Sequence, residues 1–170
     1  MYSGQYAIAN PDRPAFIMAG SGIAVSYAEF EARSNKLAHF LRDQGLGFQD
    51  HYAIFMENNE RYMESCSAGE RAGLYYTCIN SYLTGDELAY IVNNSESKVL
   101  ITSKAKIDVV ADALSSCPNI EVVLVTDAAD TDLPQLMTDY ASAILEYPAT
   151  PLADETLGTS MLYSSGTTGQ

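Results

Sequence analysis

A row of small residues near the end of the printed sequence carries groups that can bind phosphate. All of them are hydroxylated or are glycine, and they are Ser164, Ser165, Gly166, Thr167, Thr168 and Gly169. Hydroxyls and unobstructed backbone N–H groups that face one side can hold phosphate oxygens. Glycine contributes because a side chain would keep the backbone away from the oxyanion. The pattern predicts a phosphate-binding loop, with a tail or linker as the alternative that this composition also fits.

Spacing alone does not decide between a loop and a tail. The stretch does not fit the G-x-x-x-x-G-K-[ST] phosphate loop, because its spacing differs and it contains no Lys. The apolar residues 160–163 directly before it are typical of the end of a buried strand. A loop that follows such a strand would lie where α/β sheets bind ligands, so the preceding elements must decide.

Length and composition indicate one domain with a substantial core. The chain has 170 residues, of which 47% are hydrophobic. It contains no run of about 18 apolar residues, so no membrane span is predicted, and its first residues lack the form of a secretory signal. The three cysteines lack metal-ligand spacing, and we expect free thiols in a reducing cytoplasm.

The charge is acidic and unevenly distributed. A net charge of −13 argues against a nucleic-acid partner, because such proteins meet phosphates with a basic patch. All nine Lys and Arg residues lie at or before Lys106, whereas residues 107–170 contain ten acidic residues. A polyphosphate at residues 164–169 would be repelled by this segment. Either these residues are not a phosphate site, or the counter-charge lies in sequence outside this chain.

The first elements are a hairpin and a helix. The apolar residues 15–19 and 23–26 flank a Gly-Ser-Gly turn, which predicts a β-hairpin. Ser26 and Glu29 have the spacing of a capping box, so a helix begins there, and Gly45 ends it. We assign no chemistry to this part.

Beyond residue 50 the pattern alternates between buried strands and amphipathic helices. The predicted strands cover residues 52–56, 74–79, 98–102, 121–126 and 159–163. The predicted helices cover residues 60–72, capped by Asn58 or Asn59, a stretch opened by a capping box at 84–87, residues 107–115 and residues 133–144. The alternation predicts an α/β fold: a mainly parallel sheet with helices on both faces, preceded by the hairpin.

The stretch Tyr163-Ser-Ser-Gly-Thr-Thr-Gly169 resembles the phosphate loop of the adenylate-forming superfamily, which includes acyl-CoA synthetases, luciferases and peptide-synthetase adenylation domains. In that family the loop continues through one variable residue, here Gln170, into Pro-Lys-Gly. Pro11-Asp-Arg-Pro14, Ser26-Tyr27 and the residues 80–91 and 98–101 are also similar to the early part of acyl-CoA synthetases. The resemblance therefore extends along nearly the whole chain in the family's order.

The resemblance implies that residues 1–170 are the N-terminal segment of an AMP-binding (adenylation) domain. Family members are much longer, so the remainder of that domain and the C-terminal domain would be absent. The family's loop Lys, Mg²⁺ carboxylate, adenine contact, ribose Asp and C-terminal-domain Lys match no position in this sequence. We therefore expect no catalytic residue within the segment, and no activity from the segment alone.

By resemblance, the implied reaction joins a carboxylic acid to AMP with loss of pyrophosphate. Residues 74–81 resemble those of fatty-acyl members of the family, so a fatty acid is the expected substrate. Coenzyme A then takes the acyl group from the adenylate. By resemblance, the four loop hydroxyls and the N–H groups of Gly166 and Gly169 would hold the ATP phosphates, and Thr167 would also touch Mg²⁺. The expected partners are thus the acid, ATP, Mg²⁺ and coenzyme A, in the cytoplasm.

Other polar and aromatic residues are better explained by structure than by chemistry. His39 and His51 are expected to be ordinary helix and surface residues, and Cys66 and Cys78 to be small core residues. Two further sets fit either a structural role or a ligand site. The three tyrosines pack on the sheet or line a cavity (Tyr75, Tyr76 and Tyr82), and Asn80 makes a turn hydrogen bond or contacts a ligand. The acidic stretch 127–132 is expected to be a solvated loop.

Besides an acyl-CoA synthetase, two other functions remain open from the sequence. The first is another adenylating enzyme, such as an aryl-acid ligase or a luciferase relative. The alternative from a different class is a non-catalytic nucleotide-binding or interaction module. An exposed sheet edge would in either case favour self-association.

Overall fold

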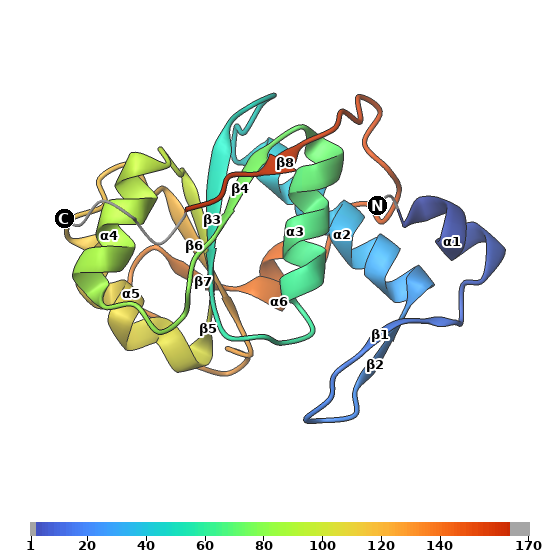
Figure 1. Cartoon of the computed structure of the whole chain (residues 1–170), viewed down its shortest axis with the longest axis horizontal. Helices are drawn as coiled ribbons and strands as arrows, with labels where there is room; N and C mark the ends of the chain where they lie inside the picture. The colour runs from blue at the N-terminus through green and yellow to red at the C-terminus, as the bar shows by residue number, and fades with distance from the viewer. Residues whose placement is uncertain (1–2, 164–170) are drawn as a thin grey trace.

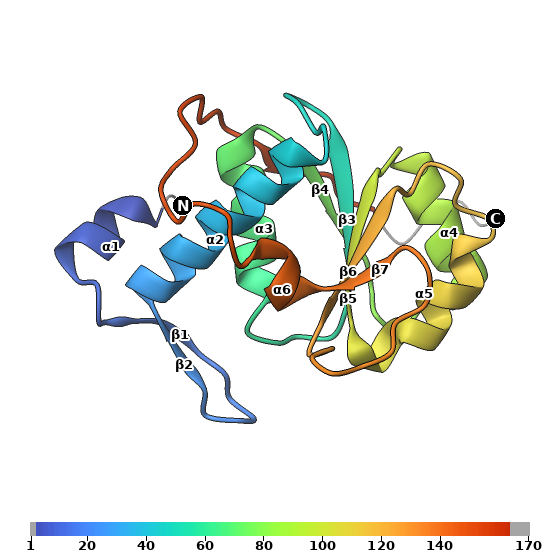
Figure 2. The same cartoon turned by 180° about the vertical axis from the view of Figure 1, so that it is seen from behind.

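A computed structural model describes residues 3–163 of the chain, and its centre is one parallel sheet (Figures 1 and 2). The strand order is β7-β6-β5-β3-β4-β8, and every neighbouring pair is parallel. The strands are β3 (His51–Phe55), β4 (Tyr75–Cys78), β5 (Val99–Ser103), β6 (Val122–Thr126), β7 (Met137–Asp139) and β8 (Thr159–Ser160). The predicted mainly parallel α/β fold is confirmed.

Helices cover both faces of the sheet, as Figures 1 and 2 show from opposite sides. One face packs against α2 (Tyr27–Asp43), α3 (Tyr62–Ala72) and α6 (Tyr140–Ile144), and the other against α4 (Gly85–Asn94) and α5 (Ile107–Leu114). The two layers follow from alternation along β3: Tyr52 and Ile54 enter one core, and Ala53 and Phe55 enter the other. All four side chains are fully buried, which explains why the strand carries no charged residue after His51.

The N-terminal part lies beside the α2–α3 layer. It consists of α1 (Gly4–Ala9) and the predicted hairpin, formed by β1 (Pro14–Ile17) and β2 (Ala24–Ser26) in antiparallel pairing. Sequence reasoning did not predict α1, because it is short and no side chain caps it. Tertiary contacts hold it instead: the Ser3 hydroxyl donates to Glu31 over 2.7 Å, and the Tyr6 ring stacks on Tyr27.

The local signals in the sequence mostly set the helix ends. Both capping boxes are present, Ser26 with Glu29 and Thr84 with Glu87, and Gly73 ends α3 in the left-handed conformation. The predicted Asn cap of α3 is wrong. The N-cap position is Arg61, without a side-chain cap, and the Asn59 side chain instead accepts the Arg61 backbone N–H over 2.9 Å.

The helix predicted over residues 133–144 is also wrong in its first half. There the chain forms edge strand β7, which pairs with β6 through Val123 and Met137, and only then the short helix α6. The Asp139 carboxylate accepts the Ser142 backbone N–H over 2.8 Å, so α6 begins after this residue. The apolar spacing was compatible with a helix, but the unpaired edge of β6 selected a strand.

A short 3₁₀ turn, η1 (Lys104–Lys106), connects β5 to α5. Within residues 3–163, none of the helices combines the length and the apolar character that crossing a membrane would require.

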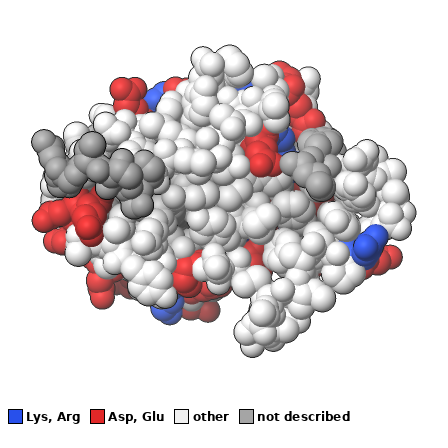
Figure 3. Space-filling view, viewed as in Figure 1, with Lys and Arg blue, Asp and Glu red and all other residues white. Residues whose placement is uncertain are grey.

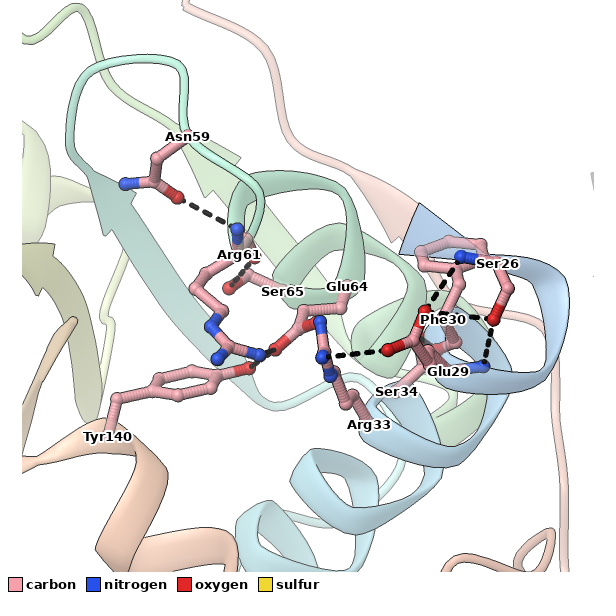
Figure 4. Close-up of polar contacts among 10 residues, drawn as sticks. All are labelled: Ser26, Glu29, Phe30, Arg33, Ser34, Asn59, Arg61, Glu64, Ser65 and Tyr140. Atoms are coloured by element: carbon pink, nitrogen blue, oxygen red, sulfur yellow. Dashed lines mark hydrogen bonds and ion pairs between the residues drawn. The ribbon is translucent and has the colours of Figure 1, made fainter. Parts of the chain in front are cut away.

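A buried carboxylate joins three helices on the α2–α3 face (Figure 4). Glu64 of α3 is fully buried, and its Oε1 accepts hydrogen bonds from the Tyr140 hydroxyl of α6 over 2.9 Å and from Arg61 over 3.3 Å. Arg33 of α2 lies 4.0 Å from Oε2. Burial raises the pKa of Glu64 above its usual 4.5, although Arg61 and the Tyr140 hydrogen bond oppose the shift.

The pKa of Glu29 on α2 is shifted in the opposite direction to that of Glu64. Its carboxylate accepts the Ser26 backbone N–H over 3.0 Å and the Ser26 hydroxyl over 2.9 Å. These bonds, the backbone one first, lower the pKa of Glu29 below 4.5. The two glutamates thus contribute to stability with opposite dependence on pH.

We predict that the two variants Glu64→Gln and Glu29→Gln change different ends of the pH–stability curve. Because the folded pKa of Glu64 is raised, its contribution is full below pH 4.5 and is lost as pH rises through the folded value. Glu29 contributes above pH 4.5, and its contribution is lost as pH falls through its lowered folded value. Urea unfolding between pH 3 and 8 should therefore show a shallower decline on the alkaline side for Glu64→Gln only, and a shallower decline on the acidic side for Glu29→Gln only. Curves that keep the shape of the unsubstituted chain would contradict this assignment.

Candidate functional site at the carboxyl edge of the sheet

The segment that precedes the predicted phosphate loop is a strand of the sheet. β8 pairs in parallel with β4, with Thr159 opposite Tyr75 and Ser160 opposite Tyr76. The Met161 backbone N–H continues the ladder by donating to the Tyr76 carbonyl over 2.9 Å. The strand is shorter than the predicted residues 159–163, but its place in the sheet agrees with the prediction. Its outgoing end therefore points to the carboxyl edge, where β3, β4, β5 and β6 also end.

Gly158 positions β8 through backbone contacts that leave no room for a side chain. Its N–H donates to the Glu70 carbonyl over 2.8 Å, and the next N–H, from Thr159, donates to the Leu74 carbonyl over 3.1 Å. A Cβ on Gly158 would overlap the carbonyl oxygens of Gly69 and Leu74 and would lie 2.7 Å from the Leu74 nitrogen. These are backbone atoms at the α3–β4 turn, so they cannot rotate away. The absence of a side chain lets the incoming chain reach the edge of β4.

Polar side chains at the carboxyl ends of the central strands form hydrogen bonds with nearby groups. The Thr102 hydroxyl of β5 donates to the Phe55 carbonyl over 2.7 Å, and the Ser103 hydroxyl donates to Glu57 over 2.6 Å. Beyond β4, the Asn80 side chain accepts the Tyr82 backbone N–H over 3.1 Å. The turn hydrogen bond predicted for Asn80 is therefore confirmed.

Charges of both signs lie at this edge. Burial raises the pKa of Asp127, which follows β6, and the nearby Glu60 and Glu57 carboxylates add to the shift while Arg61 opposes it. Lys104 and Lys106 follow β5, and the Lys106 ammonium lies 5.6 Å from the centre of the exposed Tyr82 ring. The fold therefore brings cations from before residue 107 to the same edge at which β8 ends. The sequence had indicated that any counter-charge would lie outside the chain.

The last described residue, Tyr163, lies against α4. Its hydroxyl donates to the Asn94 side chain over 2.6 Å. Its ring helps to line a cavity of about 390 Å³ together with Leu83, Asp86, Glu87, Tyr90 and Ile91. The cavity combines apolar walls with two carboxylates and lies directly before the predicted loop. The loop residues themselves, Ser164, Ser165, Gly166, Thr167, Thr168 and Gly169, lie outside the described residues.

The remaining sequence candidates have structural surroundings. His39 Nε2 lies 3.0 Å from the Thr150 carbonyl, and the His51 ring packs on Tyr75. The Tyr76 ring is buried in the core, whereas Tyr82 is exposed and contacts neither Tyr75 nor Tyr76 in any ring pair. In the described part of the chain, no group of three His, Cys, Asp or Glu side chains could hold a metal ion.

The comparisons with known proteins bear on the whole chain. The model of the family described as "AMP-binding enzyme" matches residues 5–170. The chain belongs to the AMP-binding enzyme family. A 3-oxocholest-4-en-26-oate–CoA ligase from Rhodococcus rhodochrous is 33% identical over 163 residues, which cover 94% of this chain and 29% of that protein. A medium-chain-fatty-acid–CoA ligase from Ectopseudomonas oleovorans is 29% identical over 149 residues, or 84% of this chain and 27% of that protein.

Solved structures of the same fold include the anthranilate CoA ligase AuaEII in complex with anthranoyl-AMP. That structure superposes with a TM-score of 0.84 at 17% identity, over 99% of this chain and 31% of the other. A protein from Rhodopseudomonas palustris superposes with a TM-score of 0.81 at 21% identity, over 96% and 40% of the two chains. At these identities the likeness concerns the fold. This member of the AMP-binding enzyme family spans about three tenths of the length of the curated relatives that it matches.

Sequence reasoning missed the residues that dock β8. Gly158 stands alone between a linker-like stretch and a strand, and a glycine in that position is a signal of close backbone approach. The cations Lys104 and Lys106 follow β5, so a parallel sheet places them at the carboxyl edge, but the sequence does not give the strand order that sets how far they lie from β8. The proximity of Cys66 and Cys78 was missed as well, since nothing in their spacing indicates that α3 lies over β4.

We predict that Gly158→Ala destabilises the chain and that Gly20→Ala, a matched control in the open hairpin turn, does not. The added methyl at Gly158 meets fixed backbone atoms, whereas nothing lies within 4 Å of a Cβ at Gly20. Urea unfolding should show a loss of about 1–3 kcal/mol for Gly158→Ala and a change within about 0.5 kcal/mol for Gly20→Ala. Equal stability of the two variants would mean that residue 158 is not held against the α3–β4 turn.

Proposed function

We propose that residues 1–170 form the N-terminal segment of the adenylation domain of an ATP-dependent acyl-CoA synthetase. The parent enzyme would activate a carboxylic acid as its acyl-adenylate and transfer the acyl group to coenzyme A. One observation carries the proposal: the Ser164–Gly169 pattern follows, after residues 161–163, a strand that is docked in parallel on β4, in a chain whose residues 5–170 match the AMP-binding family.

The proposed role of the loop is to position phosphates. The hydroxyls of Ser164, Ser165, Thr167 and Thr168 and the N–H groups of Gly166 and Gly169 would bind the ATP phosphates, and Thr167 would also contact Mg²⁺. None of these groups is a base or a nucleophile. In this proposal the loop holds the triphosphate in line for attack by the carboxylate, and no residue of the segment takes part in bond formation.

A fatty acid is the acid that we propose, acted on in the cytoplasm. Support comes from relatives whose names state fatty-acid or oxocholestenoate CoA ligation. An acid with a large apolar body also agrees with the apolar wall that Leu83, Tyr90 and Ile91 form in the cavity beside Tyr163, whose remaining lining is Asp86 and Glu87.

We predict that the full-length protein catalyses fatty-acid-dependent exchange of pyrophosphate into ATP, and that Thr167→Ala lowers this rate by about 10²-fold, as the loss of one preorganised donor does in other enzymes. Thr150→Ala is a matched control, because this exposed residue contacts His39 only through its backbone carbonyl. Exchange with aryl acids but not with fatty acids would assign the protein to the aryl-acid ligases. A full-length protein that exchanges with no acid while this 170-residue chain binds ATP would favour a non-catalytic module.

We also predict that this chain alone binds ATP only weakly and adenylates no acid. Residues 107–170 contain ten acidic and no basic residues, and the family's loop lysine matches no position in the sequence. Titration calorimetry with millimolar ATP and Mg²⁺ should give a dissociation constant above the micromolar range. Micromolar binding would contradict the prediction.

The edge at β8 leads us to propose self-association of this chain. The edge strand is two residues long, and the large apolar side chains of Leu157 and Leu162 beside it are 85% and 79% exposed. Figure 3 shows that charged side chains are sparse over the middle of this face.

We predict an apparent mass that rises with concentration in light scattering. The double variant Leu157→Lys, Leu162→Lys should remain monomeric, because it places charge on both sides of the edge strand. A clean monomer at high concentration for the unsubstituted chain would contradict the prediction.

A further inference from the structure

Two cysteine side chains meet between α3 and β4. The sulfur atoms of Cys66 on α3 and Cys78 at the carboxyl end of β4 lie 3.7 Å apart. The sulfurs of a disulfide are bonded at about 2.0 Å, so these two need to approach each other by roughly 1.7 Å. Cys117, the third cysteine, is buried in the core on the opposite face of the sheet. The fold therefore brings together one pair of thiols and keeps the third apart.

The surroundings of the pair favour a thiolate on Cys78. Hydrogen bonds from the Cys66 thiol and from the Tyr62 hydroxyl lower the pKa of Cys78 to about 7, against the effect of burial. The same bond to Cys78, together with burial and the Glu70 carboxylate, raises the pKa of Cys66. Tyr52 and Tyr76 also face the pair, and burial raises the pKa of both phenols, so they stay neutral near pH 7. One thiol is thus prepared to attack, and the other remains protonated beside it.

A small molecule can reach the Cys66 side of the pair. Both cysteines are only partly buried. Cys66 also lines a cavity of about 240 Å³ between α1, the hairpin, α2 and α3, together with Phe16, Phe30 and Met63. This volume holds several water-sized molecules, each of which occupies about 30 Å³ in the liquid. A peroxide molecule therefore fits.

We propose that Cys66 and Cys78 form a redox-modification site, at which hydrogen peroxide oxidises the two thiols to a disulfide that joins α3 to β4. The nearest alternative, a pair of inert core thiols, does not account for the direct sulfur contact between a residue of α3 and a residue of β4.

The reaction proceeds in two steps. The Cys78 thiolate attacks one peroxide oxygen, the O–O bond breaks, and the departing hydroxide takes up the proton that the thiol has released, which leaves a sulfenic acid and water. The Cys66 sulfur then attacks the Cys78 sulfur, the S–O bond breaks, and the Cys66 proton leaves with the hydroxide as a second water. The thiols lose two electrons, which reduce one peroxide to two waters. A dithiol reductant reverses the change by thiol–disulfide exchange.

Peptide mapping of the folded chain tests the proposal. The chain is treated with equimolar hydrogen peroxide at pH 7.5, alkylated, and digested with trypsin without reduction; cleavage after Arg71 separates the two cysteines. We expect a peptide pair linked through Cys66 and Cys78, an alkylated Cys117, and loss of the link with dithiothreitol. Alkylation of Cys66 and Cys78 to the same extent as without peroxide would overturn the proposal, as would their oxidation without a link or equal linkage to Cys117.

Variants separate a prepared pair from chance proximity. Cys117→Ser should form the disulfide at the rate of the unsubstituted chain. Tyr62→Phe should form it several-fold more slowly at pH 7, because it removes one of the bonds that lower the pKa of Cys78, whereas Tyr90→Phe on the exposed face of α4 should have no effect. Equal rates for Tyr62→Phe and Tyr90→Phe would overturn the assignment of Cys78 as the attacking thiol. The mapping of the unsubstituted chain decides the proposal even where a variant fails to fold.

Discussion

The docking of residues 156–161 against the α3–β4 turn is the contact on which the candidate site depends. Gly158 makes it possible, because its backbone lies where a side chain would collide with the carbonyls of Gly69 and Leu74. Three backbone hydrogen bonds, from Gly158, Thr159 and Met161, then align the incoming chain with α3 and β4. Without this alignment a short polar stretch would follow a loop. With it, the described chain that leads to this stretch is a parallel strand of the sheet.

The rest of the sheet makes that edge a suitable place for an anion. The parallel order β5-β3-β4-β8 brings the ends of four strands together, and the polar residues Thr102, Ser103 and Asn80 there are already hydrogen-bonded to the Phe55 carbonyl, the Glu57 side chain and the Tyr82 N–H. Lys104 and Lys106 add positive charge to a segment that is otherwise acidic. These two cations do not offset the carboxylates of Asp127, Glu57 and Glu60 at the same edge, which agrees with the weak ATP binding expected of this chain.

Much of the fold could be predicted because its signals are local. The capping boxes at Ser26 and Thr84 set helix starts, Gly73 sets a helix end, and the apolar runs of β3, β5 and β6 can be buried only in a sheet covered on both faces. The failures have tertiary causes. β7 exists because the edge of β6 was open to pairing, and α1 exists because Ser3 and Tyr6 find partners on α2.

The candidate site was predictable in type but not in construction. The hydroxyl-and-glycine pattern at 164–169 suggested phosphate chemistry, and its family resemblance suggested which reaction. The role of Gly158, the cations after β5 and the meeting of Cys66 with Cys78 all require knowledge of which elements are neighbours in space. A single sequence does not contain that information in any short window, because strand order places residues side by side that are dozens of positions apart.

Amide hydrogen exchange measured by NMR at residues 157–161 tests the central claim most directly. The N–H groups of Thr159 and Met161 donate to β4 and the turn before it, whereas Leu157 is exposed. If β8 is docked as a strand of the sheet, the Thr159 and Met161 amides exchange at least about 10²-fold more slowly than that of Leu157. Exchange of all three amides at the rate of an unstructured peptide would contradict the account, because the predicted phosphate loop would then follow a free tail.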